Sequence, residues 1–387
     1  MNRKIYNLVI LLLISSLGLI AQTRKKYQKT FSVDKNTSLL FQTHNIDVTF
    51  KVWDRDEVKV DFSVDFKNYS EEEIGAISSG IEVEANMKYK RGDAKYLQIQ
   101  NISPTSIGRL SYQIKSGEIH IKDMPWTKEE PNRYRSVKDL NKEILNDAKG
   151  FEDLEGYVVF KNDSIALKDI KNTTRKEIQS IQGSYIIYVP KYMKLGITIS
   201  SANINFEGTF TSLISAVLQE SKVQATELLH KNNVFNFVNG TFKVKKIIGG
   251  NFSFKNITSV LIGQIENAVL ETEFSAIAIG EIIQNVEIKD FKSNFFIYNL
   301  GDNFESINMI CEYSDIKMYA IKDQKYYMEA IGNNAVLNDN GTKIIMQPNK
   351  EGKKFKMFTR GKDNPETRKN TFKIDLIHGF VTLFYNK

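Results

Sequence analysis

The chain of 387 residues contains a single cysteine, Cys311, which excludes an internal disulfide. Its four histidines are far apart, and none has a second ligand at metal-binding spacing. It has neither a phosphate-binding glycine loop nor a Gly-x-Ser-x-Gly nucleophile turn. The net charge of +7 is mild for this length, which argues against a nucleic-acid partner. We therefore expect no catalytic, cofactor or metal site; the four histidines are His44, His120, His230 and His378.

Long apolar runs are confined to the N-terminus. Arg3 and Lys4 precede an apolar stretch from Leu8 to Ile20, and Ala21 offers a cleavage point. This pattern is typical of a secretory signal peptide over residues 1–21. No cysteine directly follows the apolar stretch, so a bacterial lipid-anchor site is not expected, and no later segment is long and apolar enough to cross a bilayer. We expect an exported chain, in the periplasm, on the outer-membrane surface or outside the cell; an uncleaved signal anchor is the alternative.

A short phrase recurs through the second half of the sequence: small–x–apolar–x–apolar–x–x–apolar. Clear copies start at Thr258, Ser275, Ser293 and Ser314, and the steps between successive starts lie between 17 and 21 residues. A fixed period of about 20 residues is the signature of a solenoid. Fainter copies start at Ala202, Ser221, Gly240 and Asn333.

Apolar residues two apart indicate strands, because successive side chains on a strand point to opposite faces. The third positions of the copies would then stack into one column, which includes Val260, Ile277, Phe295 and Ile316. A second, weaker strand precedes each small residue. The sequence predicts an all-β fold: a single-stranded parallel β-solenoid, right-handed, with coils of about 17–21 residues.

Outside the repeats the pattern changes. Residues 22–66 show alternating stretches that predict paired strands, and residues 67–184 an α+β segment that caps or flanks the solenoid. Helices are expected to open at Ser70 and Ser136, because each begins a capping motif. Residues 185–340 hold the repeats, and residues 341–387 are expected to supply strands that cap the far end.

The stretch Tyr185–Leu195, which contains Tyr188-Val-Pro-Lys191, resembles the Tyr-x-Val-Pro-Lys-x-x-x-Leu element of a bacterial putative-adhesin family with a β-solenoid fold. Phe274-Ser275 and Tyr313-Ser314 are similar to that family's repeats, as is the Trp53–Val58 element. The resemblance covers roughly residues 28–66 and 185–340 and departs from the family where Ser201 and Asn294 replace glycine. It implies an exported envelope protein of unassigned biochemistry, and it supplies no catalytic residues.

One outward strip is apolar in successive repeats, and contiguous apolar surface is usually covered by something. We expect either the flanking segments or a partner, protein or polysaccharide, to cover it. The candidate partner surface consists of Leu261, Ala276, Ala278, Phe296 and Tyr298.

The function expected from the sequence is a non-catalytic, adhesin-like binding or structural module at the cell envelope. One alternative is a carbohydrate-active β-helix enzyme, which would need clustered carboxylates on adjacent coils. The other is a periplasmic scaffold or sensor. The outward charges do not form an acidic groove in the sequence pattern; they are Lys222, Lys243, Lys245, Glu271, Glu273, Asp315 and Lys317.

Overall fold

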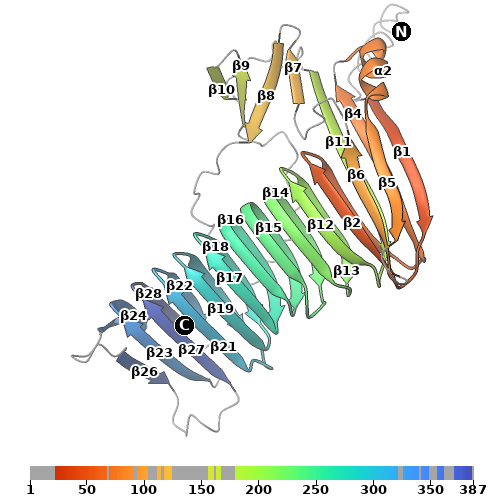
Figure 1. Cartoon of the computed structure of the whole chain (residues 1–387). Helices are drawn as coiled ribbons and strands as arrows, with labels where there is room; N and C mark the ends of the chain where they lie inside the picture. Colours follow the sequence, from red (N-terminus) through yellow and green to blue (C-terminus); the bar gives the residue numbers. More distant parts are fainter. Residues whose placement is uncertain are drawn as a thin grey trace, which may run out of the picture.

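Strands dominate the computed structural model, in one large and mostly parallel sheet, with the single helix α2 (Glu71–Ser79) among the described residues (Figure 1). The all-β prediction is confirmed at this level. The predicted signal peptide and the helix expected at Ser136 lie outside the described residues. The structure describes residues 22–67, 69–89, 94–102, 111–114, 117–123, 156–160, 163–166, 179–320, 326–339, 341–347, 355–360 and 370–385.

The strands form two ribbons of parallel neighbours. In spatial order, ribbon A consists of β6 (Lys95–Ile102), β2 (Thr37–His44), β12 (Lys194–Ser200), the first halves of β14 (Ile214–Leu228), β15 (Val234–Ile248) and β16 (Asn251–Glu266), then β17 (Ala268–Glu273), β19 (Asn285–Phe291), β21 (Ser306–Glu312), β27 (Thr371–Ile377) and β23 (Tyr327–Asn333). Ribbon B consists of β11 (Gln179–Pro190), β3 (Asp47–Trp53), β13 (Asn203–Phe210), the second halves of β14, β15 and β16, then β18 (Ala276–Ile282), β20 (Asn294–Leu300), β22 (Asp315–Ala320), β28 (Phe380–Tyr385) and β24 (Ala335–Asp339).

The predicted interior column is present. Val260 pairs with Ile277, Ile277 with Phe295, and Phe295 with Ile316 on neighbouring parallel strands of ribbon B. All four side chains are fully buried. Alternation of apolar and polar residues therefore sets the register, because a slip of one residue would turn every buried side chain outward.

The inner faces of the two ribbons pack against each other across one core. Phe242 of ribbon B lies 6.1 Å from Phe235 and 5.0 Å from Phe254 of ribbon A, measured between ring centroids. Such aromatic pairs add to the free energy gained by burial alone. The core runs without interruption along both ribbons.

Two of the fainter repeats are in a different register from the one expected. A bulge at Gly208 follows Phe206, so Phe210, and not Thr209, continues the buried eighth-position column by pairing with Leu228. In the last copy Leu337, and not Ala335, lies in the column that contains Ile316. The first shift follows from the bulge at Gly208, which the period alone does not reveal.

At the first end of the stack, a strand from a distant part of the sequence is inserted. β11 pairs in parallel with β3 and antiparallel with β4 (Glu57–Lys67), so it lies between them. Residues 22–66 were expected to form paired strands; β1 (Gln22–Ser32) and β4 do pair, but β3 and β4, which are consecutive in the sequence, are separated by β11. Two outer strands complete this end, with β1 antiparallel to β4 and β5 (Glu82–Tyr89) antiparallel to β6.

Helix α2 lies next to this end and has the capping box predicted from the sequence. The Ser70 hydroxyl accepts a hydrogen bond from the Glu73 amide at 3.3 Å, and the Glu73 carboxylate accepts one from the Ser70 amide at 2.7 Å. Ile74 is the helix residue that is buried in the core. Four short antiparallel strands extend from β11 beside the stack (Figure 1): β7 (Ser111–Ile114), β8 (Gly117–Asp123), β9 (Gly156–Phe160) and β10 (Asp163–Ala166).

The far end of the stack has a similar insertion. β27 pairs with β21 on one side and β23 on the other, and β28 lies between β22 and β24 in the same way. These strands were expected to close the array, and the pairing places them inside it. The outer positions are held by two antiparallel strands, β26 (Phe355–Arg360) on β23 and β25 (Thr342–Met346) on β24.

Candidate binding surface

The corner between each ribbon A strand and the following ribbon B strand has a left-handed backbone. Glycine, asparagine and aspartate tolerate this conformation, whereas other side chains collide with their own backbone. Asparagine accordingly stands at four of the ten corners, and glycine at none. The ten residues with positive φ at these corners are Asn45, Ser201, Glu220, Asn239, Asn256, Phe274, Lys292, Tyr313, Asn334 and His378.

At eight of the ten corners the next residue is small, because neighbouring backbone approaches it closely; Ile46 and Ile257 are the exceptions. A Cβ added to Gly379 would lie 2.3 Å from the carbonyl oxygen of Ser314. Where serine stands instead, its hydroxyl accepts a backbone hydrogen bond from the adjacent repeat. Ile257 donates to Ser275 at 3.0 Å, and Ser275 donates to Ser293 at 3.0 Å. The small first position of the repeat is thus explained by the corner.

A buried carboxylate completes the corner of the repeat that contains Ser293. Asp290 accepts hydrogen bonds from the hydroxyls of Thr272 and Ser314, and from the amide of Ser293 at 3.0 Å. Burial raises the pKa of the adjacent Cys311 thiol, and the charge of Asp290 raises it further. Because the carboxylate is surrounded by donors, we assign this cluster a structural role.

Aromatic side chains line the corner of four neighbouring repeats; we name Phe274, Phe291 and Tyr313, which are exposed, and His378, which is half-buried, the aromatic ridge. Ring centroids are 5.5 Å apart for Phe274 and Phe291, 5.9 Å for Phe291 and Tyr313, and 5.0 Å for Tyr313 and His378. Tyr313 is 51% exposed, and the two phenylalanines are 39% and 38% exposed. The row follows the stack, because each ring belongs to a different repeat.

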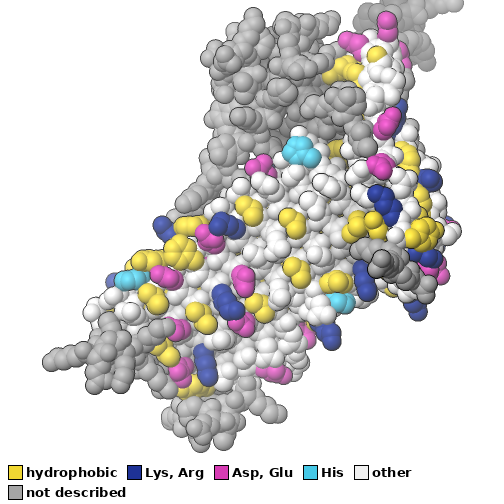
Figure 2. All heavy atoms as spheres, viewed as in Figure 1, with side chains coloured by type: hydrophobic (Ala, Val, Ile, Leu, Met, Phe, Trp, Pro, Cys, Tyr) yellow, Lys and Arg dark blue, Asp and Glu magenta, His cyan; other side chains and the backbone are white. Residues whose placement is uncertain are grey.

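Charged residues border the aromatic ridge, and several form ion pairs with one another. Lys255 lies 2.7 Å from Glu273, and Lys289 lies 3.1 Å from Glu287. The ammonium of Lys292 lies 5.6 Å from the ring centroid of Phe274, a cation–π distance. On the face shown in Figure 2, acidic and basic side chains are intermixed with hydrophobic ones.

The strip proposed from the sequence is brought together but covered. Leu261, Ala278, Phe296 and Tyr298 form one cluster, separate from the main core, and all are buried. Ala276, the fifth residue of the strip, is half-buried. Side chains this deeply covered are not accessible to a partner, so the aromatic ridge is the better candidate surface.

The cluster continues into an aromatic stack on the outer face of ribbon B. Tyr298 stacks on Tyr319 with centroids 5.0 Å apart, and Tyr319 stacks on Phe384 at 5.0 Å. Lys317, which was predicted to face outward, lies 5.1 Å over the Phe296 ring and 2.9 Å from Asp315. This outward charge is therefore already engaged with its neighbours.

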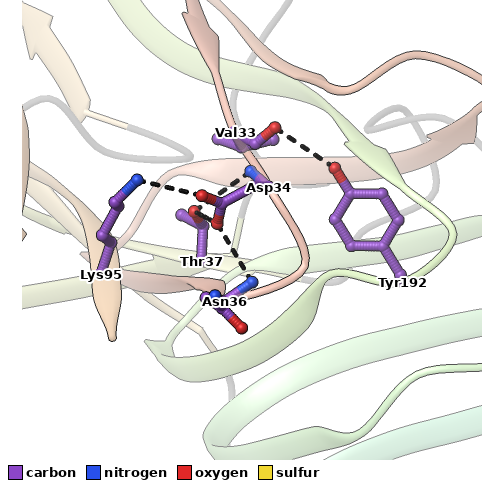
Figure 3. A network of polar contacts seen from close by, with 6 residues as sticks. All are labelled: Val33, Asp34, Asn36, Thr37, Lys95 and Tyr192. Carbon is purple, nitrogen blue, oxygen red and sulfur yellow. Dashed lines mark hydrogen bonds and ion pairs between the residues drawn. The ribbon is translucent and has the colours of Figure 1, made fainter. Parts of the chain in front are cut away.

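A polar network at the first end of the stack has a structural role (Figure 3). The Asp34 carboxylate accepts hydrogen bonds from the Thr37 hydroxyl at 2.7 Å, the Asn36 amide at 3.0 Å and Lys95 at 3.0 Å. These bonds, with that from Thr37 the largest, lower the pKa of Asp34. Tyr192 donates to the carbonyl of Val33 at 3.4 Å. The network ties the turn before β2 to β6 and to the chain after β11.

Two residues of the aromatic ridge stood out in the sequence, but they were interpreted as part of the repeat. Phe274 and Tyr313 each stand immediately before a corner serine, and the sequence analysis treated them as part of the repeat pattern. Their exposure depends on the left-handed backbone, which directs the side chain away from the core. Neither Phe291 nor His378 follows that pattern.

Neither a family model nor a curated protein matches this chain. A solved structure of a putative cell adhesion protein from Clostridium sporogenes aligns with 94% of this chain and 100% of its own, at 8% sequence identity and a TM-score of 0.18. Within the described residues, no helix is long and apolar enough to cross a membrane. Nor do those residues contain a group of three or more His, Cys, Asp or Glu side chains placed to hold a metal ion.

Proposed function

We propose that this protein is an exported, non-catalytic β-solenoid that acts as an adhesin-like binding module at the bacterial cell envelope. The observation that carries the proposal is the aromatic ridge, a row of four rings, three of them exposed, on an otherwise regular array of strands. Monomeric proteins rarely expose contiguous apolar side chains without a use for them. A regular stack holds such side chains at fixed spacing.

The pairing of the strands supports the solenoid. In the middle of the array the chain alternates between ribbon A and ribbon B, and each strand pairs in parallel with the strand one repeat later. Ala268 pairs with Val286, 18 residues further on, and Ile277 pairs with Phe295, also 18 residues further on. A chain that alternates between two ribbons while advancing along both of them winds as a coil.

The surroundings of the aromatic ridge support binding over chemistry. Glycoside cleavage requires two carboxylates that face a substrate and differ in protonation. Glu273 and Glu287, both near the ridge, are instead paired with Lys255 and Lys289. Such paired charges are typical of a solvated surface.

Export is proposed from the sequence of residues 1–21, in which a basic start precedes the apolar stretch from Leu8 to Ile20. The test is expression of the full chain in a gram-negative host, followed by fractionation and mass spectrometry of the N-terminus. We expect a processed chain that begins at Gln22 in the periplasmic or surface fraction. A chain that retains Met1 in the cytoplasm would contradict the proposal.

Binding is tested by sedimentation of the purified chain with isolated bacterial envelopes. We expect it to sediment with the envelopes, and we expect the variant Tyr313→Asn to remain in the supernatant. The variant Val217→Asn, which changes an apolar residue that is 51% exposed outside the ridge, is the matched control. Equal sedimentation of the wild type and both variants would contradict the proposed function, and so would release of sugars from the envelopes. Failure of the wild type to sediment would favour a periplasmic scaffold.

A further inference from the structure

The aromatic ridge uses backbone positions that are unfavourable for the residues that occupy them. Phe274 and Tyr313 have φ angles of 49° and 56°, in the left-handed region. At the equivalent corners Asn239 and Asn256 have φ angles of 58° and 55°, and asparagine adopts this conformation readily. A bulky residue there is an outlier that costs free energy, and such outliers cluster at functional sites.

Partial burial of the rings offsets only part of this free-energy cost. Phe274 is 39% exposed and Tyr313 is 51% exposed, so much of each ring contacts water. Interior residues of the same repeats, such as Ile277 and Ile316, are fully buried. The rings are therefore less buried than interior residues and lie where a ligand can reach them.

The spacing of the rings indicates a ligand with a repeating unit. Adjacent centroids are between 5.0 and 5.9 Å apart, and the rings come from four different repeats of the stack. Neighbouring strands lie ≈ 4.7–4.9 Å apart, so the row follows the stack axis. The planes of Phe274 and Phe291 are 88° apart and those of Phe291 and Tyr313 are 80° apart, so a linear polymer along this axis meets ring faces and ring edges in alternation.

The charges beside the aromatic ridge indicate that the ligand is uncharged. The ion pairs Lys255–Glu273 and Lys289–Glu287 place both signs close together, with N–O distances of 2.7 and 3.1 Å. A charged polymer is attracted by an excess of one sign, which this arrangement does not offer. Hydroxyl groups can instead donate to carboxylates and accept from ammonium groups.

We propose that the aromatic ridge binds an uncharged linear polysaccharide, with the sugar chain lying along the stack. The apolar C–H groups of the sugars pack on the exposed faces and edges of Phe274, Phe291 and Tyr313, and the sugar hydroxyls bond to neighbouring charged groups such as Lys292. Two further exposed apolar residues are close to the ridge in the sequence: Ile310, three residues before Tyr313 and 49% exposed, and Phe380, two residues after His378 and 57% exposed. This inference rests on the proposed binding function and specifies its ligand.

The test is affinity electrophoresis of the exported chain in native gels that contain laminarin, xyloglucan, galactomannan, mannan or dextran. We expect at least one of these neutral polysaccharides to retard the protein, with no loss of retardation in 0.5 M NaCl. Phe274→Asn and Tyr313→Asn should each weaken the apparent affinity at least tenfold. Val217→Asn should leave it unchanged.

These variants are chosen to keep the fold. Asparagine stands naturally at other corners, so each substitution relieves backbone strain while it removes a ring. Circular dichroism and the midpoint of urea unfolding verify that the variants are folded. Equal retardation of the wild type and both corner variants, or retardation by alginate and heparin but by no neutral polysaccharide, would overturn the inference.

A second measurement separates this inference from the proposed function. Envelopes are treated with protease or with periodate, which destroys vicinal diols of sugars, before sedimentation with the protein. Loss of binding after periodate alone supports the polysaccharide. Loss after protease alone leaves the proposed function intact and overturns the sugar ligand, and absence of binding to untreated envelopes overturns both.

Discussion

The backbone amide of Ser275 donates a hydrogen bond to the hydroxyl oxygen of Ser293, one repeat further along the stack, at 3.0 Å. The Ser275 hydroxyl in turn accepts from the amide of Ile257 and donates to the carbonyl of Glu273 at 2.9 Å. Serine side chains therefore replace the backbone pairing that the corner interrupts. Buried amides without such partners would be costly.

Removing one of these hydroxyls should destabilise the fold. Ser275→Ala leaves the buried amide of Ile257 without its acceptor, and we expect the free energy of unfolding to fall by about 1–3 kcal/mol. Urea denaturation measures the change. Ser215→Ala, at an exposed strand position, is the control and should change stability by less than about 0.5 kcal/mol. Equal effects of the two substitutions would contradict the role of the hydroxyl.

The interior column should be sensitive to loss of volume. Ile279 is fully buried between Ile262 and Ile297 of neighbouring strands. We expect Ile279→Ala to lower the free energy of unfolding by about 2–5 kcal/mol, because it removes buried apolar surface and leaves a cavity. Glu271→Ala, on the outer face of ribbon A, should have little effect. A small loss at Ile279 would contradict its place in the core.

The left-handed backbone at its corner predicts that the ring of Phe274 can be removed without loss of stability. Phe274→Asn replaces a strained residue by one that favours the left-handed region, and that relief is of the order of 1–2 kcal/mol. The loss of the contacts with Phe291 and Lys292 opposes it. We expect the midpoint of urea unfolding to stay the same or to rise. A marked decrease would show that Phe274 is held there for packing.

Substitution by alanine should have opposite effects on stability at two glycines. A Cβ at Gly379 would approach the Ser314 carbonyl oxygen to 2.3 Å, so Gly379→Ala should destabilise the chain by roughly 1–3 kcal/mol. A Cβ at Gly75, in helix α2, would have no atom within 4 Å. Gly75→Ala should therefore raise stability by about 0.5–1 kcal/mol. Thermal unfolding of the two variants gives the comparison, and destabilisation by both would refute it.

Alkaline pH should weaken the fold through buried tyrosines. Burial raises the pKa of Tyr69 to about 12, with a smaller contribution from the charge of Glu73, and burial also raises the pKa of Tyr192 to about 12. In the unfolded chain tyrosine ionises at about 10. Between these values the unfolded chain releases protons that the folded chain retains, so stability should fall as the pH rises from about 10 to about 12.

Urea unfolding at pH 8, 10 and 11 measures this dependence. The absorbance at 295 nm should show that part of the tyrosine ionises only when the chain unfolds. Tyr69→Phe removes one of the groups, and its stability should therefore fall less steeply with pH. Stability that does not change between pH 8 and 11 would contradict the assigned burial.

The sequence predicted the middle of the array well, because alternation at Val260, Ile277 and Phe295 reflects burial that each repeat shares with its neighbours. It failed at the ends. Nothing in the spacing of Tyr185 or Phe372 indicates that their strands insert between others, because that depends on which edges are left open when the chain folds.

The candidate binding surface was predicted less well. Leu261 and Phe296 were correctly grouped on a face outside the main core, but their coverage depends on tertiary packing that a period cannot reveal. Phe274 was visible as part of the repeat. Its exposure follows from a backbone angle, and aromatic residues give no local signal of a left-handed corner.

The insertion of β27 and β28 also bears on biosynthesis. Residues 327–339 leave the ribosome before residues 371–385, yet in the described structure their parallel strand partners are those later residues. Strands β23 and β24 therefore lack their parallel partners until residues 371–385 have been synthesised. During synthesis the nascent chain would expose unpaired strand edges at this end until residues 371–385 emerge. Quality-control proteases could recognise these edges.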